Sequence, residues 1–138
     1  MKNFNNIDLK FKQFQSLYRN EPFQWGVNDC SHFSAKWIKL FIGKDIEKDM
    51  PTYSSEVEAI QVLSGLGYSS QEDSLDNYFN RVNKKQLMRG DIVGHYFKDA
   101  NYMAMGIFTG ESSMFKAPHG ILHLPYRDID PMLCWSVE

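Results

Sequence analysis

The spacing of the apolar residues changes along the chain, and this change constrains the fold more than any other feature of the sequence. Up to about residue 65, apolar residues recur at steps of three and four, which is typical of amphipathic helices. From Gly90 onward, short apolar runs are separated by Gly, Asp, Asn and Pro, which is typical of strands and turns. The sequence therefore predicts an α+β fold in which N-terminal helices pack on an antiparallel β-sheet.

The first two predicted helices flank the loop that contains Pro22 and Gly26. One helix spans residues 7–18, and the other spans residues 30–42 and stops at Gly43. Either Asn28 or Asp29 is a suitable N-cap for the second helix, since both side chains carry an oxygen that accepts from free backbone N–H groups. The polar run GKDIEKDMPTY is expected to be a linker.

Later elements have weaker signals. Ser55-x-x-Glu58 is a capping-box pattern that predicts a third helix, which ends at Gly65 or Gly67. Residues 72–79 are expected to add one or two helical turns. Strands are expected within DIVGHYF, YMAMGIFTG, SMFKAP and GILHLPY, and in the apolar C-terminal segment.

Length and composition exclude several classes of protein. A chain of 138 residues predicts a single domain over 1–138, and 43 % apolar residues are enough for one core. The net charge of −2 does not favour a nucleic-acid partner. No apolar run has the length of a signal peptide or a membrane span, so we expect synthesis in the cytoplasm. Two distant cysteines predict neither a disulfide framework nor a metal site, and no cofactor is implied.

Cys30 follows Asn28-Asp29 at the predicted start of the second helix. Free N–H groups and the helix dipole at such a position stabilise a thiolate, so Cys30 is a candidate nucleophile. A negative charge on Asp29 opposes ionisation of the thiol unless Asp29 serves as the cap. The alternative is that Cys30 is a small buried residue of the core, a frequent role of free cysteine.

The segment PFQWGVNDCSHF resembles the loop-to-helix segment of the NlpC-type papain-like cysteine peptidases, which are bacterial cell-wall endopeptidases and amidases. Trp25, Gly26, Asp29, Cys30 and Ser31 match that family's pattern of Trp-Gly followed by Asp-Cys-Ser. The runs RGDIVG, AMGIFTG and MFKAP are similar to its first three sheet strands. The resemblance implies a papain-like fold with Cys30 in the position of the nucleophile.

The chain is also similar to a compact branch of that superfamily found among the tail proteins of bacteriophages and prophages. Members of this branch have a Gly-Leu-x-x-Leu-Pro segment and a terminal Trp-x-Val. The corresponding residues here are Gly120, Leu122, Leu124, Pro125, Trp135 and Val137. This resemblance implies a role in a virion tail, with other tail proteins or peptidoglycan peptides as partners.

The catalytic pattern of the peptidases is broken at two positions. The position of the family's catalytic histidine holds Ala104, and the polar residue that orients the imidazole would fall near Lys116. Alanine has no base, and a lysine cation cannot accept a hydrogen bond from an imidazole N–H. The sequence thus predicts that the usual Cys–His pair is missing.

The remaining histidines are candidates for a relocated base. His95, in DIVGHYF, shares a strand face with Asp91 and Val93 and would neighbour the strand of Ala104; His123 is a further strand candidate. His32 lies two residues after Cys30, which turns the two side chains apart on a helix, and His119 lies in a turn. Each histidine also has a purely structural interpretation.

Two functions therefore follow from the sequence. In the first, the chain is a degenerate, non-catalytic tail-associated protein that keeps the peptidase scaffold. In the second, it is an active peptidase or amidase that cleaves peptidoglycan stem peptides, with Cys30 as nucleophile and His95 or His123 as base. An effector that acts on host proteins is a third, less favoured interpretation.

Overall fold

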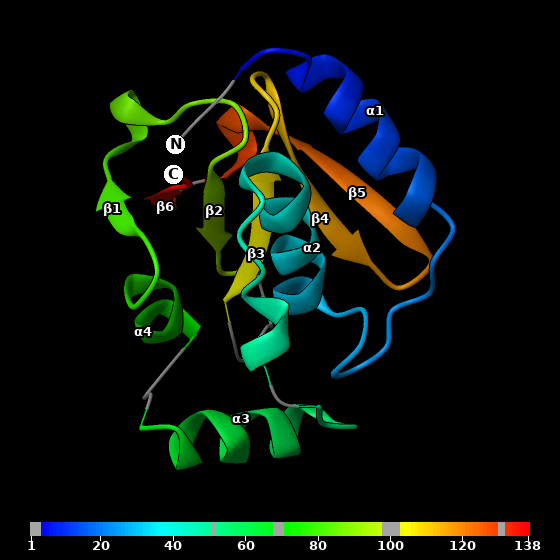
Figure 1. Cartoon of the computed structure of the whole chain (residues 1–138), viewed down its shortest axis with the longest axis vertical. Helices are drawn as coiled ribbons and strands as arrows, with labels where there is room; N and C mark the ends of the chain where they lie inside the picture. Colours follow the sequence, from blue (N-terminus) through cyan, green and yellow to red (C-terminus); the bar gives the residue numbers. More distant parts are fainter. Residues whose placement is uncertain (1–3, 51, 68–70, 98–102, 130–131) are drawn as a thin grey trace.

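The structure is a computed structural model, and it describes the chain except for residues 1–3, 51, 68–70, 98–102 and 130–131 (Figure 1). The described helices are α1 (Ile7–Tyr18), α2 (Cys30–Ile42), α3 (Glu56–Gly65) and α4 (Gln71–Asp76). The described strands are β1 (Asn80–Val82), β2 (Ile92–His95), β3 (Ala104–Phe108), β4 (Ser112–Ala117), β5 (Gly120–Pro125) and β6 (Leu133–Ser136). Three short 3-10 helices complete the set: η1 (Glu47–Asp49), η2 (Lys84–Gln86) and η3 (Tyr126–Asp128).

The six strands form one antiparallel sheet in the order β1-β6-β2-β3-β4-β5. Strands β2 to β5 follow one another as a meander, as the sequence predicts. Strand β6 then returns across the sheet and pairs with both β1 and β2. The predicted α+β class, with N-terminal helices on an antiparallel sheet, is confirmed.

Helices α1 and α2 begin and end where the sequence predicts. The Asp29 side chain accepts a hydrogen bond from the His32 backbone N–H and caps α2, and Gly43 ends this helix with a φ of 74°. At α3 only half of the predicted capping box forms. Ser55 Oγ accepts from the Glu58 N–H, but the Glu58 carboxylate accepts from Ser54 instead of from Ser55.

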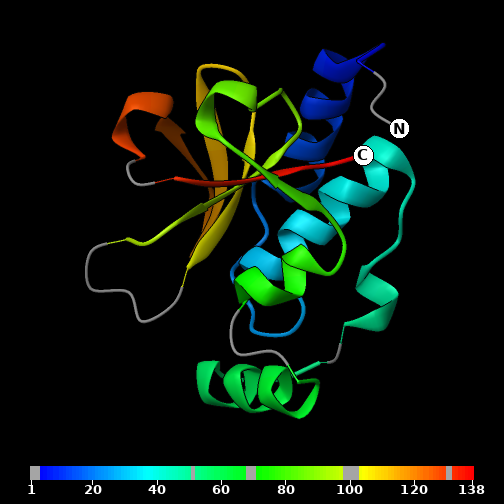
Figure 2. The ribbon, with the colours of Figure 1, turned by 90° about the vertical axis from the view of Figure 1, so that its left-hand side faces the viewer.

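The main core lies between the helices and one face of the sheet, and Figure 2 shows α1 and α2 on that face. Helix α2 packs on β3 and β4. Trp37, at the centre of α2, is completely buried, and its indole N–H donates to the Gly90 carbonyl at 2.9 Å. Met105 and Ile107 are the residues of β3 that belong to this core.

The opposite face of the sheet carries a second, smaller cluster. Its buried members are Val93, Phe108, Phe115 and Ile129, and Ala104 packs against them. Because side chains alternate between the two faces of a strand, Ala104 and Phe108 point away from α2 while Met105 points toward it. This division between the two faces determines which residues reach Cys30.

Among the described residues, no helix is long and apolar enough to cross a membrane.

Candidate functional site

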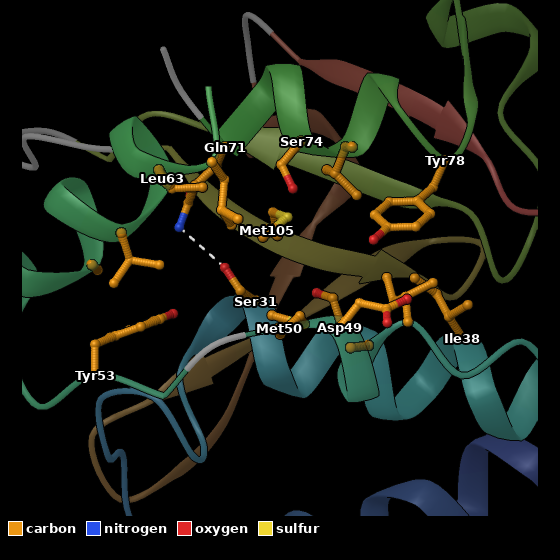
Figure 3. Close-up of a pocket in the computed structure, with 17 residues that line it drawn as sticks. Ser31, Ile38, Asp49, Met50, Tyr53, Leu63, Gln71, Ser74, Tyr78 and Met105 are labelled. Carbon is orange, nitrogen blue, oxygen red and sulfur yellow. Dashed lines mark hydrogen bonds between the residues drawn. The ribbon is translucent and has the colours of Figure 1, made fainter. Parts of the chain in front are cut away.

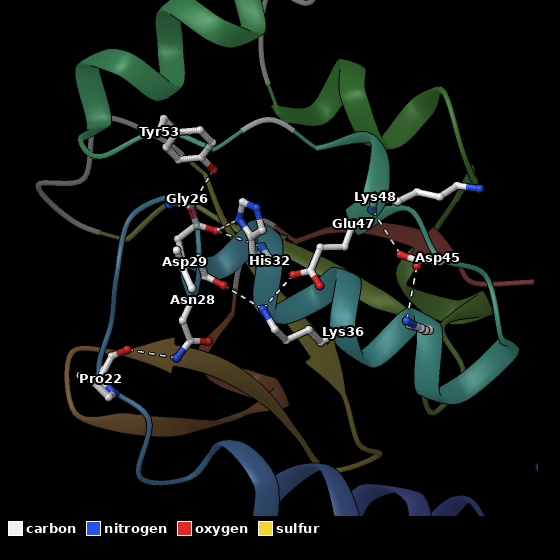
Figure 4. A network of polar contacts seen from close by, with 12 residues as sticks. Pro22, Gly26, Asn28, Asp29, His32, Lys36, Asp45, Glu47, Lys48 and Tyr53 are labelled. Atoms are coloured by element: carbon white, nitrogen blue, oxygen red, sulfur yellow. Dashed lines mark hydrogen bonds and ion pairs between the residues drawn. The ribbon is translucent and has the colours of Figure 1, made fainter.

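The start of α2 is organised around the Asp29 carboxylate, which is 1 % exposed (Figure 4). Its Oδ1 accepts from the backbone N–H and from Nδ1 of His32, each at 2.9 Å. Its Oδ2 accepts from the Gly26 N–H at 3.0 Å and from the Tyr53 hydroxyl at 2.6 Å. Burial by itself would raise the pKa of Asp29, but these four donors lower it to about 2. Asp29 is therefore a fixed negative charge that joins α2, the preceding loop and the segment around Tyr53.

Gly26 is required by the close approach of this loop to Tyr53. Its φ is 75°, and a Cβ at this position would lie 2.1 Å from the Tyr53 carbonyl oxygen. Trp25 lies beside it in the turn, with its ring edge-on to Phe23 at a centroid distance of 5.0 Å. Trp25 and Gly26 thus belong to a closely packed loop directly before Cys30.

Cys30 is the first residue of α2, but its side chain is part of the main core and only 6 % exposed. Burial, with a smaller contribution from the charge on Asp29, raises the pKa of the Cys30 thiol to about 11. Hydrogen bonds with the Met105 backbone, Ser31 and Gln71 act in the opposite direction and do not offset the burial. At neutral pH the thiol is therefore protonated.

His95 and His123, the two proposed bases, lie elsewhere. His95 pairs with Ala104 across β2 and β3, and its ring contacts Phe97 and Phe115 on the face of the sheet opposite to α2. His123 is exposed on β5 and borders a surface groove next to α1. The structure does not bring either residue to Cys30.

The other two histidines have different surroundings. His32 is buried and bonded to Asp29, and His119 is exposed in the turn between β4 and β5. The strongest influences on the pKa of Cys30 are its burial, the Met105 backbone, Asp29, Ser31 and Gln71, and none of these groups is a histidine.

The two positions that break the catalytic pattern have structural roles. Ala104 points into the second cluster, so a side chain at this position does not face Cys30 in this register. The Lys116 ammonium donates to the carbonyls of Glu21, Ala117 and Gly120 at 2.5, 2.9 and 2.9 Å. It thereby attaches the loop before Cys30 to the β4–β5 hairpin.

A pocket of about 280 Å³ lies beside the N-terminal half of α2 (Figure 3). Helix α2 forms its floor, and residues of η1, α3, α4 and β3 surround it. Ser31, next to Cys30, lines the pocket and accepts a hydrogen bond of 3.1 Å from the Gln71 side-chain amide. Cys30 itself does not line the pocket.

Sequence reasoning missed Tyr53 and Gln71, the two residues that complete this region. Tyr53 is the last residue of the run GKDIEKDMPTY, and Gln71 follows the third helix; the apolar residues of both segments have no clear period. A tyrosine 24 positions after a capping aspartate carries no local signal of the contact between them.

Comparison with known proteins places the chain in a family. No curated protein matches the sequence. Among solved structures, RipD from Mycobacterium tuberculosis aligns with a TM-score of 0.48 and 15 % identity, over 95 % of this chain and 96 % of that chain. RipD is described as a non-catalytic NlpC/p60 domain protein with an adaptation to peptidoglycan-binding function. The family model "Domain of unknown function (DUF6950)" matches residues 4–137, a range that includes every described helix and strand.

Proposed function

This chain belongs to the DUF6950 family, and we propose that it is a non-catalytic, NlpC-like protein of a bacteriophage or prophage tail. The observation that carries the non-catalytic part is the state of Cys30. Its sulfur is buried, its pKa is raised to about 11, and the two proposed bases, His95 and His123, have their contacts in other parts of the sheet. A thiol in this state is a poor nucleophile, because the thiolate is the reactive form.

The peptidase scaffold can be kept when catalysis is lost, because the catalytic base is not needed for the fold. A cysteine at the first position of a helix that faces an antiparallel sheet is the arrangement expected of the NlpC-type fold, and α2 and β3 have it. Replacing a base by Ala104 removes the general-base contribution of about 10²- to 10⁴-fold while leaving the strand intact. The Asp29 cap, Gly26 and Lys116 then maintain the loop as structure.

The tail role is supported by the sequence resemblance, which extends from the loop around Pro22 to the terminal Trp135-x-Val137. In this role the surface of the domain binds neighbouring tail proteins after synthesis in the cytoplasm. The alternative is an active peptidase or amidase in which Cys30 attacks stem peptides of peptidoglycan. Its supporting observation is the location of Cys30 at a helix N-terminus beside the Met105 N–H.

Two measurements separate these functions. The rate of iodoacetamide alkylation of Cys30 is measured against pH in a Cys134→Ser background, because Cys134 is a second buried thiol. Release of muropeptides from purified peptidoglycan is compared between the wild type and Cys30→Ser. We expect slow alkylation without a plateau below about pH 9 and no release that depends on Cys30. Release by the wild type alone would establish the peptidase instead.

The tail assignment has its own test. Purified virions of the phage or prophage that encodes the chain are analysed by mass spectrometry, before and after removal of loosely bound protein with high salt. We expect the chain in the salt-washed particles. Its absence from particles would contradict the tail role and leave the non-catalytic assignment standing.

A further inference from the structure

The pocket beside α2 has mostly apolar walls that come from five segments of the chain: α2, the segment around η1, α3, α4 and β3. The apolar lining residues include Ile38, Met50, Val62, Leu63, Leu66, Leu75 and Met105. Water can form few hydrogen bonds with such walls, so the pocket favours an apolar occupant.

The size of the pocket limits the occupant. Its volume is about 280 Å³. A cavity of roughly 150 Å³ takes up benzene, so this pocket suits a ligand of about ten non-hydrogen atoms. That size corresponds to a short alkyl chain with a small head group.

Two polar atoms at the α2 side of the pocket lack partners among the described residues. Ser34 is 1 % exposed, lines the pocket, and its hydroxyl has no hydrogen-bond partner. The Gln71 carbonyl oxygen is also buried and without a partner, while its amide nitrogen donates to Ser31. Because a buried polar atom without a partner costs free energy, an occupant that donates to Gln71 and bonds to Ser34 would be stabilised.

The charge of the lining excludes anions. No Lys, Arg or His is among the residues of the described chain that line the pocket, and its single charged residue is the exposed Asp49. A carboxylate or phosphate would be buried there without a counter-charge, at a large cost in free energy. Because Asp49 is exposed, a buried cation would have no buried counter-charge either, so the head group of the occupant is uncharged.

From these four observations we propose that the pocket binds a small neutral amphiphile, an alkyl chain that ends in an uncharged group able to donate and accept hydrogen bonds. A primary amide fits this description. The site goes beyond the proposed function, which requires no small ligand. The polar end of the site lies at Ser34 and Gln71, and the apolar lining residues surround the rest of it.

The full chain is titrated with octanamide and, in parallel, with octanoate, which has the same number of non-hydrogen atoms. Binding is followed at pH 7.5 by calorimetry and by backbone amide NMR. We expect saturable 1:1 binding of octanamide, with shifts at Ser34 and Gln71, and at least tenfold weaker binding of octanoate. No saturable binding of octanamide, or equal affinity for the two compounds, would overturn the proposal.

A matched pair of variants tests where the ligand binds. Ala59→Phe fills the pocket from α3 and should abolish binding, whereas Ile60→Phe, on a residue that is 55 % exposed and outside the lining, should preserve it. Gln71→Leu keeps the volume and removes the carbonyl acceptor, so it should weaken octanamide binding about tenfold. This third variant tests the head-group contact even if Ala59→Phe does not fold. Wild-type affinity in Ala59→Phe or Gln71→Leu would contradict the proposed site.

Discussion

The Tyr53 hydroxyl donates a hydrogen bond of 2.6 Å to the Asp29 carboxylate, across 24 positions of the sequence. Through this bond the segment after η1 is joined to the first turn of α2. The same carboxylate also accepts from Gly26 and His32. One buried charge thus connects three segments that meet beside Cys30.

Tyr53→Phe should lower the free energy of unfolding by about 1.5–3 kcal/mol, since it removes one donor to a buried, ionised acceptor. Urea denaturation at pH 7 measures the loss. Tyr96→Phe is the control: the Tyr96 hydroxyl also donates to a carboxylate, that of Glu72, but this bond is exposed, so its loss should change the free energy of unfolding by less than about 0.5 kcal/mol. Equal effects of the two substitutions would show that the bond to Asp29 contributes nothing specific.

Asp29 should make the fold sensitive to acid. Its pKa is about 2 in the folded chain, below the ordinary value of 3.8 for an aspartate side chain. The resulting stabilisation, about 2 kcal/mol, is present above about pH 4 and is lost as the pH falls toward 2. Asp29→Asn keeps a capping oxygen but does not titrate, so its stability should change less between pH 5 and pH 2.5. An unchanged acid dependence in Asp29→Asn would contradict this assignment.

Gly26→Ala should be far more destabilising than Gly43→Ala, although the two glycines have nearly the same φ of 75° and 74°. At Gly43 a Cβ meets nothing within 4 Å, so the alanine only introduces backbone strain, which lowers the free energy of unfolding by about 1 kcal/mol. At Gly26 the new Cβ also overlaps the Tyr53 backbone, and we expect a loss of more than about 3 kcal/mol. Thermal melting of the two variants provides the comparison.

Lys116→Met should lower the free energy of unfolding by about 1–2 kcal/mol, because three carbonyls lose a charged donor while the apolar stem is kept. The residue is partly exposed, which limits the effect. Lys85→Met, on an exposed lysine, serves as the control in the same urea titration. A loss no larger than that of the control would show that Lys116 does not hold the loop.

The division of the sheet into two faces predicts where an added imidazole would act. Met105→His places the ring on the face that contains Cys30, and an imidazolium there should lower the thiol pKa and raise the alkylation rate at pH 7.5 about tenfold or more. Ala104→His places the ring in the second cluster and should leave the rate unchanged. Both variants are measured in the Cys134→Ser background. A rate increase in Ala104→His alone would show that the assignment of faces is wrong.

The elements that the sequence predicts well are those with local signals. Residues 7–18 and 30–42 have a strong helical period, and Asp29 and Gly43 mark the ends of the second helix by side-chain and backbone chemistry alone. The strands from Gly90 onward follow from short apolar runs and their turns. These signals need no knowledge of distant contacts.

The missed features depend on contacts between distant segments. Strand β1 has three residues and one partly buried side chain, and it exists because β6 pairs with it. The composition of the run GKDIEKDMPTY predicts a linker, yet Ile46 is 6 % exposed and Met50 lines the pocket. Isolated apolar residues at irregular spacing give no periodic signal.

His95 illustrates a more general limit. The alternation of side chains correctly places His95 on the same face as Val93. It does not reveal which of the two faces α2 covers, and the distance from Cys30 to any histidine depends on that choice. The relation between a helix and a sheet face is set by the whole core, so one strand cannot predict it.

The position of β6 has a consequence for biosynthesis. Because β6 (Leu133–Ser136) lies between β1 and β2, β1 cannot join the β2–β5 meander in one sheet until β6 has left the ribosome. A nascent chain that has already formed α2 and the β2–β5 meander still exposes the edge of β2, which is a template for pairing with other chains. The sheet can therefore be completed only after β6 has left the ribosome, and a chain interrupted shortly before Leu133 should be prone to aggregation.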